Sequence, residues 1–299
     1  MHAILLIDKP AGLSSAEVVR RVKRRVAVKV GHLGTLDPFA TGLLPLCLGE
    51  ATKISQFLNT ADKSYEGIIR LGSATDTGDR TGQVTRTAAV PALDTVDLAS
   101  LARRFTGELL QTPPMYSALK REGVPLYRLA RQGLEVERSP RAVRIDRLAF
   151  TPHGGDALRF DLACSKGTYV RVLAEEIGAA LGSAAHLDAL RRTGFGRFRI
   201  ERAASLDAWD PAHPTAVVPL SEALAHLPAV PIDLKAVTAV RQGKAWPLSA
   251  LSGKSSSEAM LLDPAGDVVA VAVRKGRSWS YARVLGGAAP PSTTSRAAP

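Results

Sequence analysis

The chain has few cysteines, and its histidines form no metal-binding motif. Its 299 residues include two cysteines, Cys47 and Cys164, which lie far apart and form no Cys-x-x-Cys pair. A disulfide framework and a zinc site therefore have no basis in the sequence. The six histidines are scattered, without a His-Glu-x-x-His motif, so we expect no catalytic metal.

Long apolar runs are missing as well. No segment approaches the ~18 consecutive apolar residues of a membrane span. The apolar start of the chain is short and is interrupted by Asp8 and Lys9, which is not the pattern of a signal peptide. We therefore expect a soluble, cytoplasmic protein without a membrane partner.

Acidic residues are scarce relative to basic ones. The 28 Asp and Glu residues face 39 Lys and Arg residues, which gives a formal net charge of +11. Such an excess favours a polyanionic partner, and nucleic acid is the most common one. The length of 299 residues is enough for about two domains.

Familiar catalytic motifs are also missing, but one isolated carboxylate stands out. The chain has neither a Gly-x-x-x-x-Gly-Lys-Ser/Thr nucleotide loop nor a Gly-x-Ser-x-Gly elbow. It does have Asp37, alone within GHLGTLDPFATGLLPL (31–46). An Asp before Pro38 is favourable in a turn, so Asp37 either shapes a turn or is presented by one.

The remaining sequence predicts a mixture of strands and helices. Ser14 and Glu17 form a capping-box pattern that predicts the start of a helix. Strands are predicted at AILLID (3–8), SYEGIIRLG (64–72), VRIDRLAF (143–150) and ALRFDLACS (157–165), and further helices at VDLASLARRFTGEL, ending at Gly107, and at GTYVRVLAEEIGAALG (167–182). Prolines gather at 208–232, and beyond them short alternating runs around Asp-Pro-Ala-Gly (263–266) predict a β module of about sixty residues.

Several of these segments resemble one known family. The stretch around Asp37, GHLGTLDPFATGLLPLCLGEATK, closely resembles the aspartate motif of the bacterial tRNA pseudouridine-55 synthases, the TruB family. Five further blocks follow the family in order, from about residue 3 to residue 200: LLIDKPAGLSS, DKSYEGIIRLGSATDTGDRTG, PPMYSALKREGVPLYRLARQG, SKGTYVRVLAEEIG and HLDALRRTGFGRF.

The resemblance implies an α+β fold in two parts. Residues 1–228 would form the catalytic domain, on a mixed, largely antiparallel sheet flanked by helices. Residues 229–286 would form a PUA-like RNA-binding β-barrel, and residues 287–299 a disordered tail, for which the composition also argues.

The implied activity is the isomerisation of uridine-55 in the T-loop of tRNA to pseudouridine. This reaction breaks the C1′–N1 bond and joins C1′ to C5 of the same base, so it needs no metal, redox cofactor or external energy. Asp37 would be the essential catalytic residue. A carboxylate can assist by covalent attack or by taking a sugar proton to give a glycal, and the sequence leaves both routes open.

The resemblance also carries six substrate-binding residues over to this chain: His32, Tyr65, Tyr169, Arg171, Leu190 and Lys9. Arg171 would pair with Asp37, because a guanidinium favours and orients the ionised carboxylate. Tyr65 would stack on the target base and assist a late proton transfer, and Tyr169 would help to hold Asp37 and the base.

The other three residues would shape the space around the nucleotide. Leu190 would pack beneath the uracil, and Lys9 would order the entrance. A stacked base must flip out to react, and His32 would fill or brace the space that it leaves.

The expected partner is the T-arm of tRNA, bound by a monomer without an obligate protein or guide RNA. One alternative is a guide-dependent relative, although the chain lacks long basic extensions. Another is a non-catalytic RNA-binding module, which would not need Asp37, Tyr65 and Arg171. A glycosidase or esterase is disfavoured because no acid–base pair or triad is recognisable.

Overall fold

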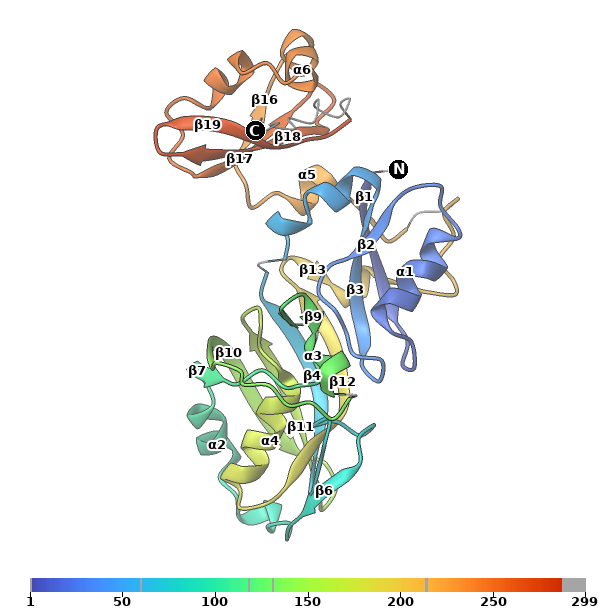
Figure 1. Cartoon of the computed structure of the whole chain (residues 1–299), viewed down its shortest axis with the longest axis vertical. Helices are drawn as coiled ribbons and strands as arrows, with labels where there is room; N and C mark the ends of the chain where they lie inside the picture. Colours follow the sequence, from blue (N-terminus) through green and yellow to red (C-terminus); the bar gives the residue numbers. More distant parts are fainter. Residues whose placement is uncertain (1, 60, 118, 131, 213–214, 287–299) are drawn as a thin grey trace, which may run out of the picture.

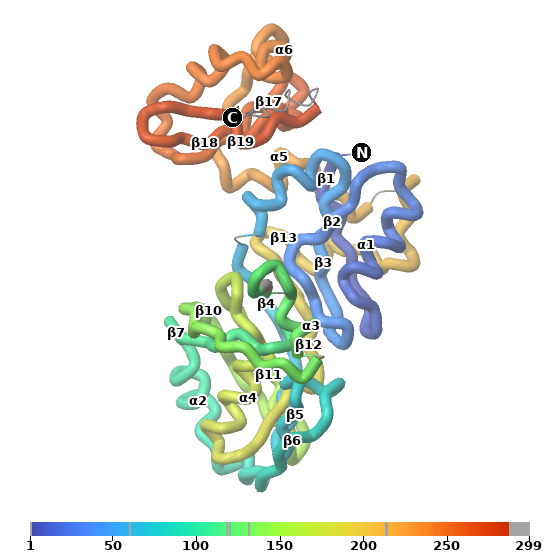
Figure 2. The backbone as a smooth tube through the Cα atoms, viewed as in Figure 1, coloured from blue at the N-terminus to red at the C-terminus, as the bar shows by residue number. Residues whose placement is uncertain are grey.

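A computed structural model describes residues 2–59, 61–117, 119–130, 132–212 and 215–286 (Figure 1). The predicted tail at 287–299 lies outside these residues. The molecule is elongated, with a large sheet and its helices forming the longer part and a small C-terminal sheet at one end (Figure 2).

The large sheet is mixed, as predicted. Its strands in spatial order are β14 (Ala204–Ser205), β1 (Ala3–Lys9), β3 (Thr41–Leu48), β12 (Ala185–Phe195), β4 (Lys63–Leu71), β11 (Ala157–Cys164), β10 (Arg141–Pro152) and β7 (Gly107–Gln111). Three short strands extend it: β2 (Val30–His32) beside β3, β15 (Val217–Pro219) beside β1, and β13 (Phe198–Arg199) beside β12. The β1–β14 and β12–β3 pairs are parallel, and the other described pairs in this sheet are antiparallel.

The helices begin where the sequence supplies caps. Helix α1 (Ser15–Lys23) has the predicted capping box, in which the Ser14 amide donates to Glu17 at 2.8 Å and the Glu17 amide donates to the Ser14 hydroxyl at 3.2 Å. Asp97 caps α2 (Leu98–Arg104). The other helices of this part are α3 (Leu126–Ala130), α4 (Val170–Ala180) and α5 (Leu220–Ala223). Two short hairpins are formed, one by β5 (Ser73–Thr75) with β6 (Val84–Thr87) and one by β8 (Lys120–Arg121) with β9 (Val124–Pro125). The 3-10 turns of this part are η1 (Gly49–Lys53), η2 (Ser55–Phe57), η3 (Leu93–Thr95) and η4 (Ile200–Arg202).

One predicted element needs correction, and one strand was not predicted. The helix expected to end at Gly107 ends at Arg104, and Gly107 instead begins β7 with a φ of +103°, which does not fit a helix. Strand β3 was not predicted. It is an apolar run that contains Pro45, and proline is unusual in the middle of a sheet. Pro45 has no N–H to donate, but its carbonyl accepts the Leu33 amide at 2.9 Å.

The core is continuous around β1 and β3. Ile4 and Leu6 are wholly buried, and so are Leu5 and Ile7 on the other face of β1. A strand buried on both faces must be covered on both, which fixes β1 in the interior. Both cysteines are buried and unpaired.

The C-terminal sheet has a core of its own but is not isolated. Its strands are β16 (Ala229–Pro231), β17 (Glu258–Leu262), β18 (Val268–Lys275) and β19 (Ser278–Val284), with helix α6 (Leu234–Arg241) and the 3-10 turn η5 (Trp246–Leu251) beside them. The predicted hairpin joins β17 to β18, closed by the Asp263 amide donating to the Asp267 carbonyl at 3.0 Å. Four buried residues belong to the main core instead: Met260, Val268, Val271 and Leu285. Within the described residues, no helix is both long and apolar enough to cross a membrane.

Candidate active site

Asp37 lies in the loop that connects β2 to β3, and this loop is held at both ends. The hydroxyl of Ser15, at the start of α1, donates to the Leu36 carbonyl and accepts the Leu36 amide, each at 2.9 Å. The Ala40 amide donates to the Asp37 carbonyl at 3.1 Å, which closes a turn. Leu36 and Ala40 are buried, while 35% of the Asp37 side chain is exposed. Asp37 therefore both shapes a turn and is presented by it.

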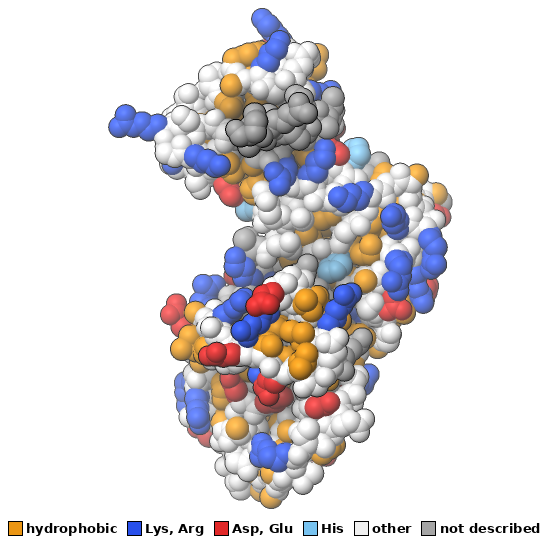
Figure 3. Space-filling model, in the orientation of Figure 1, with side chains coloured by type: hydrophobic (Ala, Val, Ile, Leu, Met, Phe, Trp, Pro, Cys, Tyr) orange, Lys and Arg blue, Asp and Glu red, His pale blue; other side chains and the backbone are white. Residues whose placement is uncertain are grey.

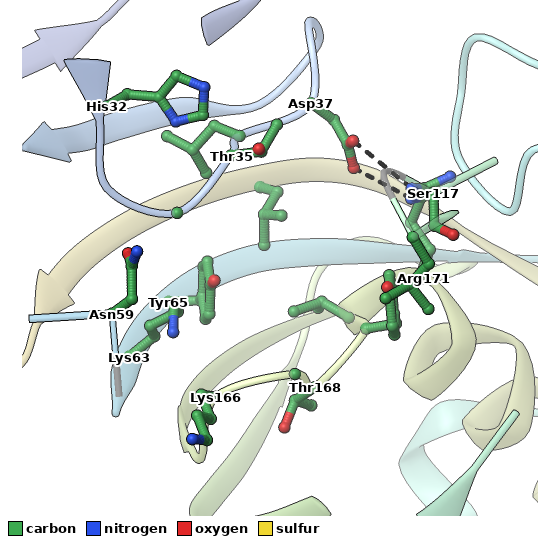
Figure 4. A pocket seen from close by; sticks show the side chains of 17 residues that line it. His32, Thr35, Asp37, Asn59, Lys63, Tyr65, Ser117, Lys166, Thr168 and Arg171 are labelled. Carbon is green, nitrogen blue, oxygen red and sulfur yellow. Dashed lines mark hydrogen bonds and ion pairs between the residues drawn. The ribbon is translucent and has the colours of Figure 1, made fainter. Parts of the chain in front are cut away.

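Arg171, in the first turn of α4, forms an ion pair with the Asp37 carboxylate. Its Nε lies 3.0 Å from Oδ2, and its Nη2 donates to Oδ1 at 3.5 Å (Figure 4). The guanidinium is itself fixed, because it donates to the carbonyls of Thr77 at 2.9 Å and Tyr116 at 2.7 Å. The structure thus brings together two residues that are 134 positions apart in the sequence.

A second carboxylate, Asp79, faces the same guanidinium. Its Oδ2 lies 3.8 Å from Arg171 Nη1, and it is buried. Its Oδ1 accepts the Thr81 amide at 2.9 Å and the Thr77 hydroxyl at 3.0 Å. Sequence reasoning missed Asp79, although it lies in the quoted block SATDTGDRTG, a carboxylate within a glycine-rich turn like Asp37.

The surroundings make Asp37 a stronger base than an ordinary carboxylate. Burial raises the pKa of Asp37, the Arg171 guanidinium opposes this rise, and the charge of Asp79 adds to it. Arg171 therefore fixes the direction of the carboxylate, while burial increases its affinity for a proton. Both properties suit a group that attacks carbon or takes up a proton.

The exposed side of Asp37 opens into a pocket of about 530 Å³. This size is typical of small-ligand sites. Tyr65 on β4 and Leu190 on β12 form part of its lining, and both are almost fully buried. Tyr169, directly before α4, also lines it, with its amide donating to the Gln111 side chain at 3.0 Å. Burial raises the pKa of Tyr65 to about 12, so its hydroxyl keeps its proton near neutral pH.

His32 and Lys9 are placed differently from each other. His32 lines the pocket from β2, and its Nδ1 is buried without a hydrogen-bond partner among the described residues. Burial lowers the pKa of His32, which favours the neutral ring. Lys9 does not line this pocket. Its Nζ donates to the carbonyls of Leu13 at 2.7 Å, Pro10 at 2.9 Å and Pro38 at 3.2 Å.

Lys9 consequently ties the end of β1 to the residue that follows Asp37. Burial lowers its pKa to about 8. The prediction that Lys9 contacts substrate finds no support in this position, because its amine is already used by three carbonyls. Its position suits the prediction that it orders the surroundings of the site.

The opposite side of the pocket carries polar and basic side chains. Asn59, Lys63 and Lys166 lie across from the Asp37–Arg171 pair, and Thr168 lines the pocket between them (Figure 4). Within the described part of the chain, no three His, Cys, Asp or Glu side chains gather in a way that could hold a metal ion.

Residues 20–170, which include Asp37, Tyr65 and Asp79, match the model of the TruB family pseudouridylate synthase N-terminal domain. The chain belongs to the TruB family. It is 49% identical over 259 residues to tRNA pseudouridine synthase B of Burkholderia pseudomallei (strain 668), covering 85% of each chain. It is 48% identical over 261 residues to tRNA pseudouridine synthase B of Dechloromonas aromatica (strain RCB), covering 85% of this chain and 87% of the relative.

The TruB fold extends to solved structures of more distant proteins. A chain in the crystal structure of a Cbf5–Nop10–Gar1 complex aligns with a TM-score of 0.67 at 26% identity, covering 95% of this chain and 84% of that one. A chain in an H/ACA ribonucleoprotein bound to a substrate RNA containing 2′-deoxyuridine aligns with a TM-score of 0.66 at 24% identity, covering 94% and 83%. The second similarity is evidence for the fold alone.

Proposed function

We propose that this protein is a tRNA pseudouridine synthase that isomerises uridine-55 in the T-loop, with Asp37 as its essential residue. The observation that carries the proposal is the Asp37 carboxylate, held by Arg171 at 3.0 Å at the edge of a pocket lined by Tyr65 and Leu190. Membership of the TruB family and the names of the bacterial relatives support the same activity.

The geometry suggests how a flipped uridine would lie. The base would lie between Tyr65 and Leu190, which offer a ring for stacking and an apolar contact. The sugar would then lie toward Asp37. From there the carboxylate either attacks C1′ and forms an ester or removes the C2′ proton to give a glycal. Both routes release the base from C1′ and allow it to turn before C5 bonds to C1′.

Two further properties of the pocket suit this reaction. With a base in the pocket, the buried walls would exclude water, which would otherwise hydrolyse the intermediate and leave an abasic site. Flipping costs a few kcal/mol, which stacking on Tyr65 and contacts to the phosphates would offset. His32, at the pocket lining on β2, would occupy or brace the space that the nucleotide vacates.

We also propose the division into a catalytic domain at 1–228 and a PUA-like RNA-binding domain at 229–286. The separate small core of the C-terminal sheet supports the division. Its four strands, in the order β16-β17-β18-β19, are compatible with such a domain. Basic side chains extend over this part of the surface and over α1 (Figure 3), which favours contact with RNA phosphates.

The expected partner is the T-arm of tRNA, and the protein would act as a cytoplasmic monomer without a guide RNA or protein subunit. The solved Cbf5 complex contains Nop10 and Gar1, so a dependence on such partners is the competing possibility. An assay with the purified chain alone distinguishes the two.

Tritium release from tRNA transcripts labelled at uridine C5 tests the proposal. Because C5 loses its hydrogen when it bonds to C1′, each conversion releases one tritium. We expect the purified chain to release one equivalent of tritium from the transcript with uridine at position 55. A second transcript, with cytidine at position 55 and label in the other uridines, should release none. Absence of release from the first transcript, or equal release from both, would contradict the proposal.

A further inference from the structure

The largest wholly buried side chain in the described part of the protein is an arginine, Arg192 on β12. Its Nε donates to the Leu43 carbonyl at 2.7 Å and its Nη2 to the Gly34 carbonyl at 3.0 Å. These two residues stand on either side of the loop that carries Asp37. The third nitrogen, Nη1, has no hydrogen-bond partner among the described residues.

Arg192 also lacks an acidic partner. No described carboxylate lies within ion-pair distance, and the neighbouring titratable group that raises the pKa of Arg192 is Tyr65. Arg192 and Tyr65 are direct partners in the β12–β4 ladder, so their side chains leave the sheet side by side. Burial lowers the pKa of Arg192, but arginine starts so far above neutrality that the charge remains.

Lys63 adds a second cation to the same side of the pocket. Its Nζ lies 4.8 Å from the centroid of the Phe195 ring, and Cζ of Arg192 lies 5.4 Å from the same centroid. Burial and the charge of Arg192 lower the pKa of Lys63 to about 8, so it is still cationic near neutral pH. The carboxylate near Lys63, Asp62, is exposed and lies 3.4 Å from Arg144.

The two sides of the pocket therefore differ in charge. On one side, Asp37 and Asp79 balance the cations Arg171 and Lys9. On the other side, Arg192 and Lys63 lie beside Gly34, and among the described residues no buried carboxylate pairs with either cation. Lys63 and Lys166 lie across the pocket from Asp37 in Figure 4. An unbalanced buried charge costs stability, and an opposite charge inside the pocket would offset that cost.

The chemistry of the reaction supplies such a charge. When C1′–N1 breaks, the bonding electron pair stays on N1, and the detached uracil carries a negative charge shared with O2 and O4. C1′ becomes electron-poor at the same time. The anion is consumed when C5 supplies the electron pair for the new bond to C1′, and the proton then lost from C5 is balanced by one gained at N1. The charge therefore exists only between bond breaking and bond formation.

We propose that Arg192 and Lys63 stabilise the uracil anion, so that the cationic side of the pocket faces the base and the Asp37 side faces the sugar. This rests on the proposed function. Arg192 does not line the pocket and is a positioning residue, whose charge acts on the base across Tyr65 and Gly34. Lys63 lines the pocket and acts directly. Fixed charges in a water-poor site act strongly on charge that develops during a reaction.

A change of leaving group tests the proposal. T-arm RNA would carry either uridine or 5-fluorouridine at the target position, and loss of the starting nucleoside would be followed in single turnovers by chromatography of digested RNA. Fluorine withdraws electrons, so the fluorinated base leaves with less help. We expect Arg192→Met to slow uridine at least about tenfold and 5-fluorouridine severalfold less. Arg192→Lys, which keeps the charge, should restore most of the wild-type ratio between the two substrates.

A purely structural role for Arg192 would slow both substrates equally, and that result would overturn the proposal, as would an unchanged rate. The matched control is Arg191→Met. Arg191 is the next residue on β12 but points to the other face of the sheet, where it lies 2.7 Å from Asp8. Arg191→Met should leave the rates with both substrates unchanged.

Lys63→Met keeps the proposal testable if Arg192→Met does not fold. Lys63 is partly exposed, so its loss disturbs the core less. It should lower the uridine rate more than the 5-fluorouridine rate, and equal losses would contradict the proposal. Failure of the proposed function would look different, because the wild-type chain would then convert neither substrate.

Discussion

Asp37 is the residue proposed to perform the bond chemistry, separately from RNA binding. Many residues would hold the RNA over a broad surface, whereas one carboxylate would break and form bonds. We expect Asp37→Ala to lower the single-turnover rate at least ~10⁴-fold, equivalent to about 5.5 kcal/mol of activation free energy, while tRNA binding changes little. Rapid-quench assays and filter binding measure the two quantities.

Asp37→Asn is the sharper version of this experiment. The amide has almost the same shape and can still accept a hydrogen bond, but it is neither nucleophilic nor basic. It should fail nearly as badly as Asp37→Ala. Retention of more than a few per cent of the wild-type rate by either variant would return Asp37 to the status of a turn residue.

The charge of Arg171 should affect how the activity depends on pH. Asp37 acts in its ionised form, so activity is lost as pH falls through a pKa that burial has raised above its ordinary value. Arg171 opposes that rise, and removing its charge in Arg171→Met should move the acid limb of kcat/KM to higher pH. Arg171→Lys should lie between this variant and the wild type, because the charge stays but the planar fork is lost.

The control for this pH experiment is Arg70→Met. Arg70 forms ion pairs with Asp156 at 2.6 Å and Asp188 at 3.1 Å, on a partly exposed face of the sheet away from Asp37. Its loss should leave the acid limb in place. An acid limb that is the same in Arg171→Met and in the wild type would mean that Asp37 ionisation does not limit the reaction.

At the scale of elements, the contact between β3 and β12 holds the far end of the Asp37 loop. Gly42 pairs with Arg192 in this parallel contact and has a φ of +98°. A Cβ at Gly42 would lie 2.3 Å from the Arg192 carbonyl oxygen, so the two strands could not keep their spacing. We expect Gly42→Ala to lower the free energy of unfolding by at least about 2 kcal/mol, measured by urea denaturation, and to lower activity as well.

Gly12→Ala separates the two causes of that loss. Gly12 has a similar φ of +84°, but a Cβ there meets no atom within 4 Å. Gly12→Ala should lower the free energy of unfolding only by the cost of backbone strain, about 1–2 kcal/mol, and activity should not fall comparably. Equal effects of the two substitutions would show that the close approach of β3 and β12 is not what requires glycine at position 42.

Elements that depend on interactions between neighbouring residues could be predicted from the sequence, whereas elements that depend on pairing between distant segments could not. The start of α1 was readable because its capping box, Ser14 and Glu17, acts over three residues. Strand β12 was not predicted, because its residues pair with segments far away in the chain. Without that strand, Arg191 and Arg192 are adjacent basic residues with no distinction between them. The pleat turns one outward and buries the other, and Arg192 was missed for this reason.

The residues of the candidate site show the same limit. Asp37, Tyr65 and Arg171 could be named because quoted blocks of sequence resemble a family. Local patterns alone could not have brought Arg171 to Asp37, since 134 residues separate them. Asp79 was within reach of the sequence, but its role depends on the guanidinium that it faces.

At the scale of the molecule, the C-terminal part is both a separate unit and a support for the rest. The Arg283 Nε donates to the Lys53 carbonyl at 3.1 Å, and the Gly286 amide donates to the Glu50 carboxylate at 2.9 Å. A chain truncated after residue 228 loses these contacts and the buried side chains that its C-terminal sheet adds to the main core. We expect it to unfold at a lower temperature and to bind tRNA more weakly, with a similar rate once saturated.

Salt dependence shows whether the lost affinity came from phosphate contacts. Each contact to a duplex phosphate contributes about −0.9 to the slope of log K against log salt concentration, so the truncated chain should have a shallower slope. Glu50→Ala in the full chain weakens the docking but keeps the basic side chains, and its slope should match the wild type. An identical slope and affinity after truncation would remove the C-terminal part from RNA binding.

The position of β1 determines the order in which a newly made chain can complete its fold. β1 leaves the ribosome well before β14 and β15, which cover its second edge and follow about 200 residues later. At 5–20 residues per second, that edge stays unpaired for roughly 10–40 s. An apolar strand with a free edge pairs readily with other chains. Production of this protein in cells should therefore depend on folding helpers that shield the nascent strand β1, and fragments that end before residue 204 should aggregate.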